Sequence, residues 1–280
     1  MTSRAKEVAG FEVLGRPIGR ERFFVIGGPC VLENEELALR IARFMQETCE
    51  HLSIPYVFKS SYDKANRTSI QSYRGPGIEE GLSILGRVRR EIGVPVLTDV
   101  HSVPEAAMAA EVVDILQIPA FLARQTDLLV AAGKTGRPVN LKKAQFLAPW
   151  DMKQSMEKIH HTGNRKVLLT ERGAQFGYNN LVVDMRSIPI MADLGCPVVF
   201  DATHSVQLPG GQGTCSGGQR EFVAPLSCAA VGAGAHGVFL EMHDDPDRAL
   251  CDGPNSLPLF ELPRLLERLL RIYRAVHSDQ

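Results

Sequence analysis

The chain has 280 residues, of which 44% are hydrophobic and 22% charged, and its 31 basic and 32 acidic residues give a net charge of −1. These values are typical of a globular protein long enough to bury a sizeable core. The near-zero charge, without a basic cluster, argues against nucleic acid or a membrane surface as a partner, and no apolar run approaches the ~20 residues of a membrane span.

In chain order, the first predicted element is a small hairpin within the first twenty residues, where Gly10, Gly15, Pro17 and Gly19 occur. Eight short segments follow, each apolar along its whole length rather than at alternate positions. Such continuous patterns predict strands buried on both faces, as in a parallel sheet. The predicted strands are 23–29, 55–60, 94–99, 115–119, 138–142, 167–171, 197–202 and 237–242.

Helical patterns lie between these strands. Asn34 is the expected cap of the first helix and Gly93 the expected end of the second, and a last amphipathic helix contains Leu262 to Tyr273. This alternation predicts a single (β/α)8 TIM barrel over residues 1–280, with the hairpin as a cap on the barrel floor. An open doubly wound sheet is the alternative, and the lack of GxGxxG after the first strand counts against it.

Polar residues concentrate where the predicted strands end, which in such a barrel is the active-site face. They are Cys30, Lys59, Lys64, Asn66, Arg67, Asp99, His101, Gln117, Arg124, Lys142, Lys143, Glu171, Arg172, Asp201, His204 and Glu241. Five of them, Lys64, Arg67, Arg124, Lys142 and Arg172, would place strong positive potential in one concave site. That potential suits a small polyanionic substrate, although any one of these cations taken alone is as readily a solvated surface residue.

Four residues carry typical metal-ligand groups: Cys30, His204, Glu241 and Asp252. A thiolate, an imidazole and two carboxylates suit Zn²⁺, Fe²⁺ or Mn²⁺ better than Ca²⁺ or Mg²⁺. Because the four lie far apart in the sequence, their spacing leaves another interpretation open. In that interpretation Cys30 is a small buried apolar side chain, His204 is a hydrogen-bonded histidine and the two acids are solvated.

Three further features bear on the setting of the site. The Gly-rich stretch at 208–213 lacks the Lys-Ser/Thr ending of a P-loop and is expected to form a lid. Six cysteines without a CxxC pair favour reduced thiols. The N-terminal MTSRAKEVAG has no apolar region typical of a signal peptide, so we expect a cytoplasmic protein.

Motifs along nearly the whole chain resemble those of the 3-deoxy-D-manno-octulosonate 8-phosphate synthases (2-dehydro-3-deoxyphosphooctonate aldolases). They run from about Gly27 to Leu259 and read GGPCVLE, FKSSYDKANRTS, RGPG, TDVH, QIPAFLARQTDL, NLKKAQF, ERGAQFGYNNLVVDMR, FDATHSVQ, SGGQR and FLEMHDDPDRALCDGPNSLPL. The resemblance implies condensation of phosphoenolpyruvate with D-arabinose 5-phosphate, for the inner-core sugar of lipopolysaccharide.

The resemblance also implies roles for single residues. The phosphoenolpyruvate-binding cations would be Lys64, Lys142 and Arg172, near Lys59, Gln117 and Ala120. The aldose side would be Asn66, Arg67 and Ser69. Arg124 would reach the aldose phosphate of a neighbouring subunit, which implies a homotetramer. His204 would stand beside phosphoenolpyruvate, followed by Gln207. The implied catalytic residues are His204, Lys64, Lys142, Asn66 and Asp252.

The metal assignment rests on the same resemblance. Cys30, His204, Glu241 and Asp252 match the ligands of the metal-dependent branch, whereas the metal-free branch has Asn in place of the Cys. CDGP at 251–254, however, resembles the metal-free branch. Three other functions compete with the main prediction: a related synthase that uses erythrose 4-phosphate, expected to carry KPRT where this chain has KANR; a Schiff-base aldolase that uses Lys142 or Lys64; and a sugar-phosphate-binding protein without activity.

Overall fold

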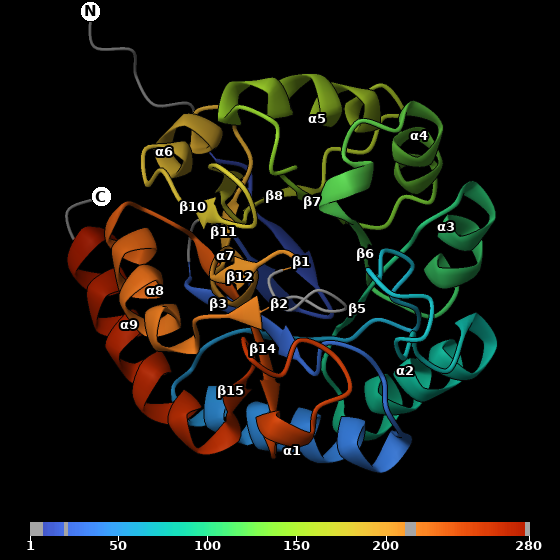
Figure 1. The fold of residues 1–280 in the computed structure, drawn as a ribbon. Coiled ribbons are helices and arrows are strands. Elements are labelled where there is room, and N and C mark those ends of the chain that lie inside the picture. Colours follow the sequence, from blue (N-terminus) through green and yellow to red (C-terminus); the bar gives the residue numbers. More distant parts are fainter. Residues whose placement is uncertain (1–7, 20–21, 211–216, 278–280) are drawn as a thin grey trace, which may run out of the picture.

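The computed structural model describes residues 8–19, 22–210 and 217–277. Eight parallel strands form a closed barrel, because each strand pairs with the next and β11 pairs with β14 (Figure 1). The strands are β3 (Phe24–Gly28), β4 (Tyr56–Lys59), β5 (Val96–Asp99), β6 (Ile115–Ile118), β7 (Val139–Lys142), β8 (Val167–Glu171), β11 (Val198–Asp201) and β14 (Gly237–His243). Each coincides with a strand expected from the sequence, so the prediction of a (β/α)8 barrel is confirmed.

Helices surround the barrel, apart from the short α7, which directly follows β11 and lies near the centre of the view in Figure 1. They are α1 (Glu35–His51), α2 (Ile78–Ile92), α3 (Val103–Ala110), α4 (Thr126–Lys134), α5 (Met152–His160), α6 (Ser187–Ala192), α7 (Ala202–Ser205), α8 (Val223–Gly232) and α9 (Leu262–His277), with 3-10 turns at Ala120–Leu122, Pro149–Asp151, Arg220–Phe222, Pro246–Arg248 and Leu259–Glu261. The expected cap is present, since the Asn34 side chain accepts from the Leu37 N–H at 2.8 Å. Gly93 ends α2 at a φ of 71°, a left-handed conformation that favours glycine.

The core has two parts. The larger part lies between the helices and the outer face of the barrel. The smaller part fills the barrel interior, where Phe24, Leu97 and Phe239 meet Val13 and Ile18. The last two belong to the N-terminal hairpin, β1 (Phe11–Val13) and β2 (Arg16–Ile18). The hairpin therefore closes the barrel floor, as expected.

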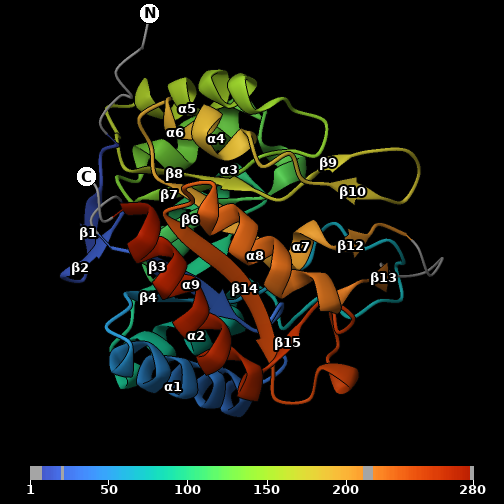
Figure 2. The ribbon, with the colours of Figure 1, turned by 90° about the vertical axis from the view of Figure 1, so that its left-hand side faces the viewer.

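The opposite end of the barrel carries the longer connections. Figure 2 shows the β1–β2 hairpin at one end and the pairs β9 (Ala174–Gln175) with β10 (Leu181–Val182) and β12 (Gln207–Leu208) with β13 (Gly217–Gly218) at the other. A short strand, β15 (Leu257–Pro258), pairs in parallel with the end of β14 there. Within the described ranges, no helix is both long enough and apolar enough to cross a membrane.

Gly28 allows the carboxyl end of strand β3 to lie close to the neighbouring strand β4. A Cβ atom on Gly28 would lie 2.1 Å from the carbonyl oxygen of Lys59. Only glycine therefore lets the end of β3 approach the end of β4 this closely. This approach brings Cys30, two residues further on, next to Lys59, whose Nζ donates to the Cys30 carbonyl at 3.2 Å.

Candidate active site

A cavity of about 390 Å³ opens at the carboxyl end of the barrel strands. This is the face where loops of a (β/α)8 barrel bring functional groups together. Most of the site residues expected from the sequence line it: Lys59, Lys64, Asn66, Arg67, Gln117, Ala120, Lys142, Arg172, His204, Gln207 and Asp252. The cavity therefore combines a dense set of cations with histidine and carboxylate groups.

Four expected residues do not line the cavity. Cys30 and Glu241 are buried beneath its floor. Ser69 is half-buried and its hydroxyl accepts from the Gln71 N–H at 3.2 Å. Arg124 is exposed, and a role toward a neighbouring subunit stays a prediction. Of the expected lid at 208–213, residues 211–213 lie outside the described ranges, while Pro209 and Gly210 line the cavity.

Lys142 extends from the end of β7 into a buried setting. Its Nζ contacts the Asp201 carboxylate and lies 3.6 Å from the centroid of the Phe239 ring. Burial lowers the pKa of Lys142 to about 8, although the negative charge of Asp201 partly opposes the shift. Lys142 is therefore a cation near neutral pH that loses its charge under mildly basic conditions.

Arg172 lines the cavity and carries a donor without a partner in the described part of the chain. Its side chain is only 5% exposed, and Nη2 donates to the Gln207 side-chain oxygen at 2.7 Å. Nη1 is buried without a hydrogen-bond partner among the described residues. A guanidinium remains charged in proteins, so a buried donor of this kind requires an acceptor. A carboxylate or phosphate in the cavity would supply it.

Glu241 lies beneath the cavity among positive groups. Lys59 Nζ is 3.4 Å and Lys64 Nζ 3.8 Å from Glu241 Oε1. Burial alone would raise the pKa of Glu241, but the charges of His204, Lys64 and Lys59 outweigh burial and lower it to about 2. Its second oxygen, Oε2, is buried with no partner in the described chain. Glu241 is thus an ionised carboxylate with an unused acceptor.

His204 lies among three carboxylate groups. Its Nδ1 lies 2.8 Å from Asp201 Oδ2, while Nε2 lies 3.5 Å from Glu241 Oε1 and 3.8 Å from Asp252 Oδ2. With Nδ1–H donated to Asp201, the Nε2 lone pair faces the other two acids. An outer carboxylate that fixes the ring in this way is typical of metal-binding histidines. Asp201, to which the sequence assigned no role, orients both His204 and Lys142.

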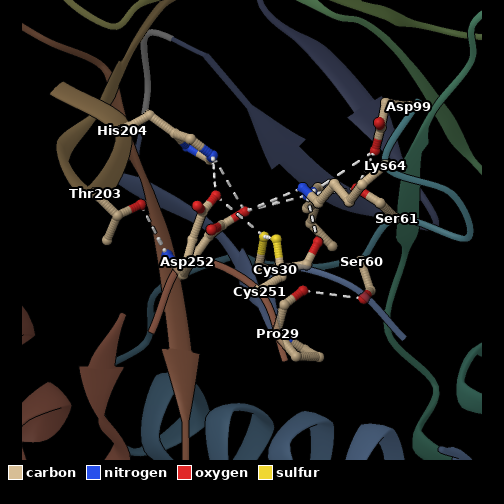
Figure 3. Close-up of polar contacts among 12 residues, drawn as sticks. Pro29, Cys30, Ser60, Ser61, Lys64, Asp99, Thr203, His204, Cys251 and Asp252 are labelled. Atoms are coloured by element: carbon tan, nitrogen blue, oxygen red, sulfur yellow. Dashed lines mark hydrogen bonds and ion pairs between the residues drawn. The ribbon is translucent and has the colours of Figure 1, made fainter. Parts of the chain in front are cut away.

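A thiol not expected from the sequence lies beside the predicted ligands. Cys251 Sγ is 2.8 Å from Cys30 Sγ, and Asp252 Oδ2 is 3.4 Å from Cys30 Sγ (Figure 3). The potential ligand atoms form two groups, each with its atoms within 4.8 Å of one another: Cys30, Cys251 and Asp252, and His204, Glu241 and Asp252. Asp252 belongs to both groups, so Cys30 is joined to the other predicted ligands through Asp252. The only sequence signal for Cys251 is its position next to Asp252.

Comparison with known proteins places the chain in a family. Residues 13–275 match the model of the DAHP synthetase I family. A 2-dehydro-3-deoxyphosphooctonate aldolase of Syntrophobacter fumaroxidans is 74% identical over 271 residues, which cover 97% of this chain and 94% of that protein. A protein of the same name from Trichlorobacter lovleyi is 63% identical, and the match covers 90% of this chain and 92% of that protein. Another from Desulfotalea psychrophila is 59% identical, and the match covers 91% of each chain. The chain belongs to the DAHP synthetase I family and groups with its 2-dehydro-3-deoxyphosphooctonate aldolases.

Proposed function

We propose that this enzyme condenses phosphoenolpyruvate, D-arabinose 5-phosphate and water to give 3-deoxy-D-manno-octulosonate 8-phosphate and phosphate, a step that supplies an inner-core sugar of lipopolysaccharide. The observation that carries the proposal is the unpaired Nη1 of Arg172 in a cavity also lined by Lys64 and Lys142. These cations match the carboxylate and phosphate of phosphoenolpyruvate. The shared name of the close relatives favours this reaction over its alternatives.

The reaction requires C3 of phosphoenolpyruvate to attack the aldehyde carbon, which leaves positive charge at C2. Water adds at C2, and the C–O bond to phosphate then breaks. The residues of this chain act by holding the anionic ends in place and stabilising charge as it moves. In this proposal Arg172 and Lys142 bind phosphoenolpyruvate, and Asn66, Arg67 and Ser69 face the aldose. Lys64 and His204 stand near the reacting carbons.

A divalent metal, Zn²⁺, Fe²⁺ or Mn²⁺, completes the proposed site. The donor set fits such an ion, because Nε2 of His204 faces two acids and Glu241 Oε2 lacks a partner in the described chain. His204, Glu241, Asp252 and Cys30 would hold it. When bound, a divalent metal can orient a water molecule, lower its pKa or polarise an aldehyde oxygen.

We further propose that residues 1–280 serve as one catalytic domain in a cytoplasmic homotetramer, with Arg124 reaching into a neighbouring site. Exposure of Arg124 outside the cavity of its own subunit supports this arrangement. Mixing an Arg124→Ala variant with a Lys142→Ala variant should restore part of the activity in hetero-oligomers, because some sites then contain neither change. If subunits exchange and activity does not recover, Arg124 serves its own subunit.

The aldose is the most informative substrate to test. We expect initial rates of phosphate release to be far higher with arabinose 5-phosphate than with erythrose 4-phosphate, at equal phosphoenolpyruvate concentration. The reason is that residues 64–69 read KANRTS, whereas a synthase that uses erythrose 4-phosphate is expected to carry KPRT there. Part of this stretch lines the cavity. Equal rates, or a preference for the shorter aldose, would contradict the proposed reaction.

Lys142 is expected to impose a pH dependence. Its pKa of about 8 lies below the usual value because of burial, so its charge is present below pH 8 and lost above it. The apparent KM for phosphoenolpyruvate should therefore rise as the pH increases through about 8, and Lys142→Arg, which stays charged, should flatten the rise.

The lowered pKa of Lys142 also favours a Schiff-base aldolase as the second candidate, because a neutral amine can attack a carbonyl. Borohydride reduction in the presence of each substrate distinguishes the two reactions, because it traps a Schiff base as a stable adduct. Phosphate release without a trapped adduct supports condensation, whereas a Lys142 adduct supports the aldolase.

A further inference from the structure

Two buried thiols from distant parts of the chain meet at the edge of the cavity, which Cys251 lines. Cys30 follows strand β3, whereas Cys251 lies 221 residues later, after the 3-10 turn Pro246–Arg248. The Sγ atoms are 2.8 Å apart, and the two residues are 3% and 4% exposed. Both are free cysteines, and Figure 3 shows their sulfur atoms side by side. The proposed reaction leaves Cys251 without a function.

Asp252 adds an oxygen to the sulfur pair. Its Oδ2 is 3.4 Å from Cys30 Sγ and accepts from Gln207 Nε2 at 3.1 Å. The backbone of Asp252 has a φ of 49°, a left-handed conformation that is uncommon outside glycine and is found where surrounding contacts hold it. All ligand atoms of Cys30, Cys251 and Asp252 lie within 4.8 Å of one another. Around a tetrahedral ion with bonds of about 2.0–2.3 Å, ligand atoms lie roughly 3.3–3.8 Å apart, so the two sulfurs would move apart by about 1 Å to share an ion with Asp252.

Arg67 holds the Cys251 sulfur from one side. Its Nη1 donates to Cys251 Sγ at 3.1 Å, and its Nη2 donates to the Leu250 carbonyl at 2.9 Å. The two contacts fix the guanidinium against the loop that carries Cys251. Cys251 also lines the cavity, so an ion entering from solvent would meet this sulfur.

We propose that Cys251 is a second thiolate ligand, which binds the metal together with Cys30 and Asp252. This inference rests on the metal site of the proposed function and extends it. Each thiol gives up one proton to solvent when its sulfur binds, so an ion that takes both sulfurs releases two protons. Two thiolates make the site softer, which favours Zn²⁺ and Fe²⁺ over Mn²⁺. CDGP at 251–254 thus supplies a ligand rather than indicating a metal-free enzyme.

Cobalt absorption tests the number of bound sulfurs directly. Full-length protein, kept reduced under argon with a phosphine, is titrated with Co²⁺, and the sulfur-to-cobalt charge-transfer absorbance is divided by the bound cobalt. Cys251→Ser should still bind cobalt with about half of the wild-type absorbance per ion, since one of two thiolates is removed. Cys30→Ser should show a similar loss. Cys49→Ser, which alters a buried thiol in α1, is the matched control and should match the wild type.

Different results overturn different statements. Unchanged absorbance per ion in Cys251→Ser, with complete loss in Cys30→Ser, would show a single thiolate and overturn this inference while the proposed metal site stands. A wild type that binds no cobalt, whether its two sulfurs are free or joined in a disulfide, would overturn both the inference and the metal site. Phosphate release from arabinose 5-phosphate tests the reaction separately. If Cys251→Ser does not fold, zinc X-ray absorption of the wild type decides: two sulfur neighbours per zinc support the inference, and one overturns it.

Discussion

Replacing Arg172 with alanine is expected to lower kcat/KM for phosphoenolpyruvate by about ten- to a hundred-fold, which corresponds to the ~1.5–3 kcal/mol of a charge-assisted hydrogen bond. Arg172 lines the cavity, and its Nη1 has no hydrogen-bond partner among the described residues. Lys142→Ala should cause a loss of similar size, because it removes a second cation from the same lining. Initial-rate kinetics with phosphoenolpyruvate as the varied substrate measure both.

The control for Arg172→Ala lies at the other end of the same strand, β8. Arg165 is exposed and precedes β8, whereas Arg172 follows it, so the two arginines flank opposite ends of one strand. Arg165→Ala should keep wild-type kinetics and fold normally. Wild-type kinetics in Arg172→Ala itself would remove this residue from the binding site.

Exhaustive chelation is expected to abolish activity, and Zn²⁺, Fe²⁺ or Mn²⁺ should restore part of it. Loss of the Cys30 thiolate leaves a harder and less selective set of ligands, so Cys30→Asn should lose tight metal binding. Because bound thiolates must first lose their protons, the metal affinity of the wild type should fall as the pH is lowered. Bound metal by elemental analysis and phosphate release before and after chelation measure the effect.

The Cys30→Asn variant tests the role of the Cys30 ligand more directly than chelation does. The lysine and arginine contacts remain in the variant, so we expect weak activity that resists chelation. Cys49→Ser serves as the control for changing a buried cysteine and should stay sensitive to chelation like the wild type. If the purified wild type contains no metal and keeps its full rate after chelation, Cys30 is only a small buried side chain.

The barrel and its hairpin cap could be predicted from the sequence because their signals are local. Strands buried on both faces are apolar throughout, so eight such runs mark a closed parallel sheet, and Asn34 and Gly93 mark the ends of helices through hydrogen bonding and φ alone. The position of polar residues at strand ends was enough to predict the lysine, arginine and histidine residues that line the cavity. The fold brings these residues together, because the parallel strands of the barrel all have their carboxyl ends at one face.

Which side chains touch within that face was decided by tertiary structure. Nothing near Cys30 in the sequence points to Cys251, because their contact depends on a loop that returns after 221 residues. Asp201 likewise gains its full role only where Lys142, 59 residues away, contacts the carboxylate that also holds His204. The sequence by itself therefore determined the fold and the chemical character of the site, since both follow from periodicity and residue type. The pairing of the thiols and the approach of His204 Nε2 to Glu241 and Asp252 were determined only by packing, because contacts a few ångströms long between distant segments depend on the whole chain.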